Sequence, residues 1–164
     1  MGKDMISKYI SAGFIVLIFL TGCGEDKKEV RDYIQAVNPL LVKVDSIKAS
    51  VEKGIGYKEY AGLITDFKTG CSGIQNKEKY ISGYYLGIIK DGLERTERRW
   101  KERLVGIGNS SDKDFDHWIK IILEEECFPY IQKAKEALHA EESSNPQKVW
   151  LQTVEKLLET KNYE

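Results

Sequence analysis

The stretch that decides the fold is VRDYIQAVNPLLVKVDSIKASV, residues 30–51. A valine recurs in it at every seventh position, and another apolar residue follows three positions after each of the first three valines. The two series are Val30, Val37, Val44 and Val51, and Tyr33, Leu40 and Ile47. Spacings of three and four residues place side chains on one face of an α-helix. The pattern therefore predicts a helix from about residue 25 to residue 53 that buries one apolar face.

A proline lies within this predicted helix. Pro39 has no N–H to donate, and its ring crowds the carbonyl of the residue four positions earlier. Because the valines keep their phase on both sides of Pro39, we expect one kinked helix rather than two helices. A stripe of this length commonly packs within its own fold, and a parallel coiled-coil dimer is the alternative.

The same one-sided apolar pattern recurs in four later segments. Turn-forming residues separate them, among them Gly-Ile-Gly at 54–56 and again at 106–108, and Ser-Ser-Asn-Pro at 143–146. Pro129 predicts a bend in the fourth helix. Short connections favour antiparallel neighbours. We expect an all-α fold, an antiparallel helical bundle of three long helices, two of them kinked by proline, and two shorter ones. The predicted helices span about residues 25–53, 57–69, 76–105, 111–142 and 146–160.

The N-terminal residues have the pattern of a signal peptide. Lys3 and Lys8 precede an uninterrupted run of apolar and small residues from 10 to 20, about half the length that a membrane-spanning helix needs. The run ends in Leu20-Thr21-Gly22-Cys23, which resembles the lipobox of bacterial lipoproteins. The resemblance implies cleavage before Cys23 and acylation of that cysteine. The alternative is an ordinary secretory signal cleaved near Gly22 or Gly24.

This interpretation divides the chain into a signal peptide (1–22), a short tether (23–28) and a helical domain (29–164). The resemblance implies a lipid-anchored protein on the extracytoplasmic face of a bacterial membrane. Gly24, in place of an aspartate after the acylated cysteine, implies the outer membrane where the host has two. Two or three acyl chains on Cys23 would hold the protein at the bilayer.

The charge balance and hydrophobic content argue against a nucleic-acid-binding protein and against a disordered one. Cleavage would remove Lys3, Lys8 and Asp4, leaving 23 of the 25 basic and 25 of the 26 acidic side chains. A net charge of −2 provides no basic field for nucleic acid, so we expect no nucleic-acid partner. The remaining 142 residues suffice for one domain with a core. A hydrophobic share of 41% argues against a disordered chain.

Two cysteines remain once Cys23 is assigned to lipid. An even pair in an extracytoplasmic protein favours a disulfide between Cys71 and Cys127. The alternative is two separate buried thiols, since free cysteine behaves as a small apolar residue.

The third predicted helix carries several tyrosines and glycines. Gly83, Gly87 and Gly92 each weaken a helix by about 1 kcal/mol relative to alanine, so we expect a packing reason for them. Close approach of a neighbouring helix is one reason. The other is a ligand cleft lined by Tyr60, Tyr80 and Tyr84.

Charged side chains offer no catalytic or metal centre. Asp114 with His117, and Glu136 with His139, resemble helical metal motifs, but both pairs lie on one predicted helix and cannot converge on one ion. Glu94 with Arg98 stands four residues apart in the acid-first order of an intrahelical ion pair.

No nucleophile motif or phosphate-binding loop is present, and we expect no cofactor. The sequence therefore favours a non-enzymatic interaction or structural module of the cell envelope, bound to another envelope protein or an external one. A small-ligand carrier or sensor with an aromatic cleft is the alternative.

Overall fold

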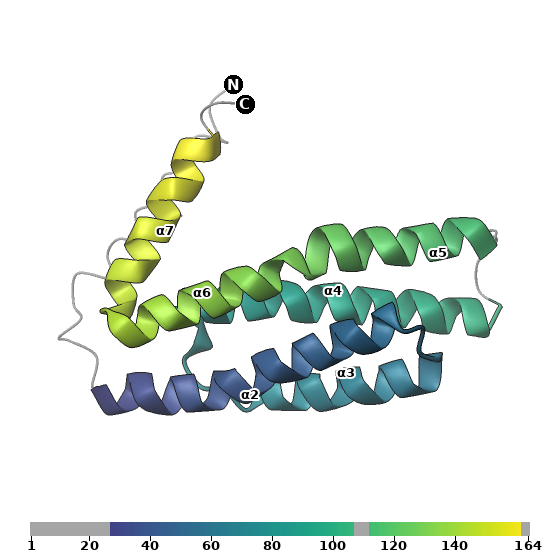
Figure 1. Ribbon diagram of the computed structural model, residues 1–164, viewed down its shortest axis with the longest axis horizontal. Coiled ribbons are helices and arrows are strands. Elements are labelled where there is room, and N and C mark those ends of the chain that lie inside the picture. Colours follow the sequence, from purple (N-terminus) through teal and green to yellow (C-terminus); the bar gives the residue numbers. More distant parts are fainter. Residues whose placement is uncertain (1–26, 107–111, 162–164) are drawn as a thin grey trace, which may run out of the picture.

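The computed structural model describes residues 27–106 and 112–161, with side chains left out for 112–116 and 157–161. All regular structure in these residues is helical, as expected for an all-α fold, and they contain no strand (Figure 1). The elements are α2 (Lys27–Glu52), α3 (Tyr57–Ser72), the 3-10 turn η1 (Lys77–Lys79), α4 (Ile81–Leu104), α5 (Asp112–Ile121), the π-helical segment η2 (Ile122–Cys127), α6 (Pro129–Ser143) and α7 (Pro146–Lys161).

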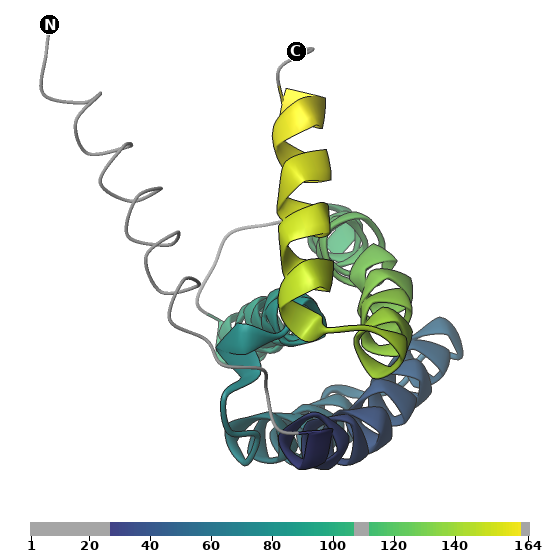
Figure 2. The same cartoon turned by 90° about the vertical axis from the view of Figure 1, so that its left-hand side faces the viewer.

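Helix α4 lies at the centre of the packing. It contacts α3, η2 and α6, while α2 packs against α3 and α6 (Figures 1 and 2). The apolar stripe of α2 is buried in the core, which confirms the predicted helix and its buried face. Pro39 lies within α2, and the helix continues on both sides of it. The buried residues of α2 are Tyr33, Ile34, Val37, Leu40, Leu41, Val44 and Ile47.

The third predicted helix begins later than the sequence pattern suggested. Asn76 has a positive φ of 55°, and the 3-10 turn follows it before α4 starts at Ile81. This turn packs directly on α4, because a Cβ on Gly83 would collide with the carbonyl oxygen of Lys77. Gly83 is therefore required by a close backbone approach.

The other two glycines of α4 differ. A Cβ on Gly92 would lie 2.9 Å from the Cβ of Cys127, so Gly92 lets η2 approach α4 closely. Gly87 is exposed, and a Cβ there would meet nothing within 4 Å. The predicted packing reason is confirmed for Gly83 and Gly92 but not for Gly87.

The fourth predicted helix is divided into α5, η2 and α6. Phe128 N–H donates to the carbonyl oxygen of Leu123, five residues earlier, at 2.7 Å. Pro129 follows at the first position of α6. Because Pro129 cannot donate to the carbonyl of Glu125 and its ring crowds that carbonyl, a widened turn before Pro129 relieves the conflict. The irregularity expected at Pro129 is therefore a π-helical segment directly before it.

A buried polar cluster of Tyr33, Ser82 and Glu141 joins α2, α4 and α6. Glu141, with no exposed surface, accepts the Ser82 backbone N–H at 3.1 Å and the Ser82 hydroxyl at 2.5 Å. Because the Ser82 proton points to Glu141, the Tyr33 hydroxyl, 2.8 Å away, donates to Ser82 Oγ. The carboxylate of Glu141 thus accepts one backbone N–H of the first turn of α4, where negative charge is favoured.

Candidate functional site

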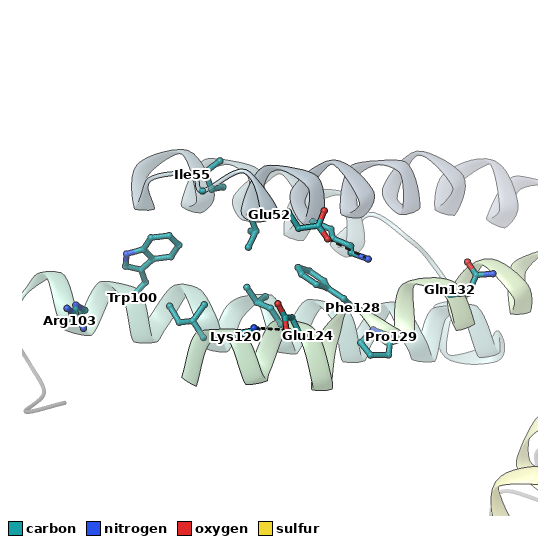
Figure 3. Close-up of a pocket in the computed structure, with 14 residues that line it drawn as sticks. Glu52, Ile55, Trp100, Arg103, Lys120, Glu124, Phe128, Pro129 and Gln132 are labelled. Carbon is teal, nitrogen blue, oxygen red and sulfur yellow. Dashed lines mark ion pairs between the residues drawn. The ribbon is translucent and has the colours of Figure 1, made fainter. Parts of the chain in front are cut away.

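A groove opens at the end of the molecule opposite the Glu141 cluster (Figure 3). Its volume is about 920 Å³, and it lies between the end of α2, the end of α4 and the chain from α5 to α6. Ile55 and Trp100 enter it from opposite sides, and Phe128 lies farther along the groove (Figure 3). The lining residues are Lys48, Val51, Glu52, Gly54, Ile55, Trp100, Arg103, Ile119, Lys120, Leu123, Glu124, Phe128, Pro129 and Gln132.

The π-helical segment forms one wall of the groove. Leu123 and Glu124 belong to it, and Phe128 and Pro129 follow directly. The close contact between Cys127 and Gly92 holds this segment against α4. Single π-helical turns often occur at functional sites because they redirect side chains that a regular helix would place elsewhere.

Aromatic residues support the opposite wall. The Trp100 ring centroid lies 5.3 Å from that of Tyr60 and 6.0 Å from that of Tyr57, with tilted planes in both pairs. Tyr60 is fully buried and donates its hydroxyl to the carbonyl oxygen of Leu93 at 3.4 Å. Burial raises the pKa of Tyr60, so its hydroxyl stays protonated. This packing fixes the Trp100 indole at the groove.

Charged side chains surround the apolar lining. Lys48 lies 3.9 Å from Glu52, and Lys120 lies 3.7 Å from Glu124; both ion pairs are exposed. The Lys48 ammonium is also 5.7 Å from the centre of the Phe128 ring. With Arg103, the lining holds three basic and two acidic side chains. Such a site can bury an apolar body and hold a charged group at its edge.

The three tyrosines of the predicted cleft are not brought together. Tyr60 contacts Trp100, Tyr80 stacks on Tyr33 with ring centroids 3.6 Å apart, and Tyr84 is 51% exposed beside Tyr85. Tyr80 directly precedes α4, whereas Tyr60 bonds to Leu93 thirteen residues later, about 20 Å along the helix. The aromatic site lies instead at Trp100 and Phe128.

The predicted disulfide is absent: Cys71 and Cys127 are free and buried. Cys127 lies at the level of Gly92 and Tyr60, and its thiol donates to the carbonyl oxygen of Ile89 at 3.5 Å. Cys71 is in the last turn of α3, eleven residues beyond Tyr60, or about 16 Å along that helix. The two thiols therefore lie at different levels of the core.

Glu136 and His139, one of the two acid–histidine pairs in the sequence, have other partners. His139 is exposed near Glu142, at 4.0 Å, and Glu136 accepts a hydrogen bond from Gln132 at 2.9 Å. The side chain of Asp114 lies outside the described residues. Within the part of the chain that the structure describes, no three His, Cys, Asp or Glu side chains are grouped so that they could hold a metal ion.

The candidate lipid site Cys23, with the rest of residues 1–26, lies outside the described residues. None of the helices in residues 27–106 and 112–161 combines the length and apolar character needed to cross a bilayer. Comparison of the chain with protein-family models, curated proteins and solved structures gives no match.

Proposed function

We propose that the chain is a lipid-anchored, non-enzymatic binding module on the extracytoplasmic face of a bacterial membrane, the outer one where there are two. Its ligand is an amphipathic small molecule bound in the groove of Figure 3. The observation that carries this proposal is the apolar lining built by Ile55, Trp100 and Phe128 in a volume of about 920 Å³. Small-molecule sites commonly have volumes of about 300–1,000 Å³ and mostly apolar walls.

The charges at the groove favour an anionic group on the ligand. Three basic and two acidic side chains line it, and each acidic one has a lysine within 4 Å. A carboxylate or phosphate at the edge of the groove could approach the ammonium groups of Lys48 and Lys120. A long-chain acid, with its chain against Trp100 and its head near Lys48 or Lys120, matches both properties of the site.

The proposed anchor follows from Leu20-Thr21-Gly22-Cys23. Cys23 stands four residues before α2, which begins at Lys27. The proposal includes an antiparallel arrangement of neighbouring long helices, supported by the short connection from Glu52 to Tyr57 between α2 and α3, which pack against each other. The anchor retains the domain at the membrane without requiring the groove to contact lipid.

A fluorescent fatty acid tests the groove. We expect a dansylated long-chain acid to bind the protein, and Ile119→Glu to weaken binding at least tenfold, because a carboxylate would replace an apolar side chain at the lining. His117→Glu adds the same charge to an exposed position two residues away and should leave binding unchanged. Equal binding by both variants would contradict the groove as the site, and so would a wild-type protein that binds no acid.

A protein-interaction module is the second candidate. Three large apolar side chains are exposed where α4 ends and along α5, namely Leu104, Val105 and Trp118. The Arg99 guanidinium lies 4.8 Å from the Trp118 ring centre. A photo-crosslinking amino acid at Leu104 should capture one defined envelope protein, whereas the same group at exposed Lys58 on α3 should not. Identical products from both positions would contradict this candidate.

A further inference from the structure

Helix α7 leaves the body of the molecule. It begins beside α6 and runs across the direction of the long helices (Figures 1 and 2). Asn145 caps its start by accepting the backbone N–H of Gln147 at 2.9 Å through its side chain. Val149, in the first turn, is buried in the core, but Leu151 is 52% exposed only two residues later. The helix is therefore docked at its base and extends outward.

The outward part of α7 has an apolar face and a polar face. Leu151 and Val154, one turn apart, are exposed and half-exposed. The sequence continues the apolar series at positions 157 and 158, both leucine. Gln152 and Lys156 are exposed and lie on the other face, while Glu155, four residues after Leu151, lies at the border of the apolar face. An amphipathic helix whose apolar face lies outside the core needs another apolar surface to cover it.

The base of α7 lies at the same end of the molecule as the start of α2. Lys27 and Val30 of α2 line a cavity of about 880 Å³ together with Asn145 and Pro146 of the α6–α7 turn. Cys23 is four residues before Lys27, and a chain of that length spans at most about 14 Å. A lipid on Cys23 would therefore bring the bilayer close to the base of α7.

We propose that α7 lies along the surface of the phospholipid bilayer, with the face carrying Leu151 and Val154 against the acyl chains. This rests on the proposed lipid anchor at Cys23. Because α7 runs across the long helices, it lies closer to parallel than to perpendicular to the membrane when the molecule stands on its anchored end (Figure 1). The anchor supplies a high effective concentration, so a helix with weak intrinsic affinity suffices.

This orientation also places the groove. The groove is lined by the last turns of α2, and α2 has 26 residues, so it lies about 39 Å along that helix from the anchored end. The opening of the groove would face the aqueous extracytoplasmic space and not the lipid. In this orientation the start of α2 lies at the membrane attachment, and the end of α2 lies at the ligand-binding groove.

Tryptophan quenching tests the proposal, since Trp150 lies on α7 and Trp118, 45% exposed, lies on α5 near the groove. The purified lipidated protein is reconstituted into vesicles of phosphatidylcholine and phosphatidylglycerol with brominated acyl chains. One variant keeps only Trp150 (W100F/W118F), and the other keeps only Trp118 (W100F/W150F). We expect quenching of Trp150 to be at least twice that of Trp118.

A matched pair of substitutions identifies the face. In the Trp150-only protein, Leu151→Asp should reduce quenching to the level of Trp118, because it puts a carboxylate into the acyl region. Gln152→Asp adds the same charge to the polar face and should keep the quenching. Circular dichroism checks that the variants remain helical. Equal effects of the two substitutions would overturn the proposed orientation of α7.

The outcomes separate the two proposals. Intact mass shows whether acyl chains are present on the purified protein. With acyl chains present, quenching of Trp150 no greater than that of Trp118 overturns the membrane role of α7 and leaves the anchor standing. A protein without acyl chains overturns both.

Discussion

The two ends of α2 meet the rest of the molecule in different ways. At its start, Tyr33 is tied through Ser82 to Glu141, and these buried hydrogen bonds join three helices. At its end, Lys48 and Glu52 line an open groove, where their ion pair has a 3.9 Å separation and is exposed to water. We call the hydrogen-bonded start of α2 the closed end, although the cavity at the α6–α7 turn lies beside it, and we call the groove at the end of α2 the open end.

The contacts at the two ends contribute different amounts to the free energy of unfolding. Buried hydrogen bonds to a charged group contribute about 1.5–3 kcal/mol each, and breaking one leaves its partner unsatisfied. Exposed ion pairs contribute about 0–1 kcal/mol. The closed end therefore fixes the helices relative to one another. The open end keeps apolar surface and few restraints, which suits a binding site.

The first prediction concerns the two thiols, which sit at different levels between the ends. Burial raises the pKa of Cys71 to about 11 and that of Cys127 to about 12, from 9.0. At pH 8 the thiolate fractions fall by roughly 100-fold and 1,000-fold. We expect alkylation of the folded protein to be slower by at least these factors than alkylation of the unfolded chain, as measured by mass spectrometry of the two peptides.

The order of labelling sharpens the comparison. Because Cys127 has the higher pKa and no exposed surface, whereas Cys71 is 3% exposed, Cys71 should be alkylated before Cys127. Both thiols should titrate after denaturation without a reductant. Failure of both to titrate would show a disulfide and contradict the structure at this point.

The second prediction is the largest change in stability. Glu141→Ala should lower the free energy of unfolding by about 3 kcal/mol, because it leaves the Ser82 N–H and hydroxyl buried without their acceptor. Glu142→Ala removes the same side chain from the adjacent exposed position and should change it by less than about 0.5 kcal/mol. Urea denaturation measures both. Equal losses would contradict the assigned role of the closed end.

The third prediction uses two glycines one turn apart on α4. Gly83→Ala should destabilise by about 2 kcal/mol, since its Cβ would meet the Lys77 carbonyl oxygen, a backbone atom that cannot move alone. Gly87→Ala should stabilise by up to about 1 kcal/mol, because its Cβ meets nothing and alanine favours the helix. Thermal melts of both variants measure the difference. Shifts of the same sign would contradict the close approach of η1 to α4.

Periodicity predicted the parts of the fold that depend on local pattern. The stripe of α2 and the start of α3 follow from apolar spacing and the Gly-Ile-Gly turn at 54–56, whereas α3 continues to Ser72, three residues beyond the predicted end at 69. The start of α4 was missed because the 3-10 turn after Asn76 depends on contact with Gly83, and a contact distance leaves no periodic signal.

The groove was missed for a related reason. Trp100 continues an apolar stripe that a sequence pattern assigns to the core, and Phe128 directly follows the π-helical segment, which leaves no periodic signal in the sequence. Pro129 was the one local signal in the sequence. It indicated a bend at the right place but did not indicate that a groove forms there. Likewise, the disulfide was wrong because cysteine counting carries no information on the levels of Cys71 and Cys127 in the core.

The last prediction concerns an ion pair between the two ends and has the smallest effect. Glu94 lies 3.2 Å from Lys90 and 3.3 Å from Lys68, so it joins α3 to α4 rather than pairing with Arg98 as the sequence suggested. Burial raises the pKa of Glu94, but the hydrogen bonds from Lys90 and Lys68 outweigh it and hold the pKa below the usual 4.5.

A carboxyl whose pKa is lower in the folded state stabilises that state above the unfolded pKa and loses this contribution as the pH falls through the folded pKa. Glu94→Gln should therefore cost about 0.5 kcal/mol at pH 7, a figure reduced for partial exposure, and less as the pH falls below 4.5. Glu59→Gln, at an exposed position of α3, serves as the control. Denaturation of each variant and of the wild type at pH 7 and pH 3 gives the difference. A cost for Glu94→Gln that is independent of pH would show that packing of the side chain, and not its charge, joins α3 to α4.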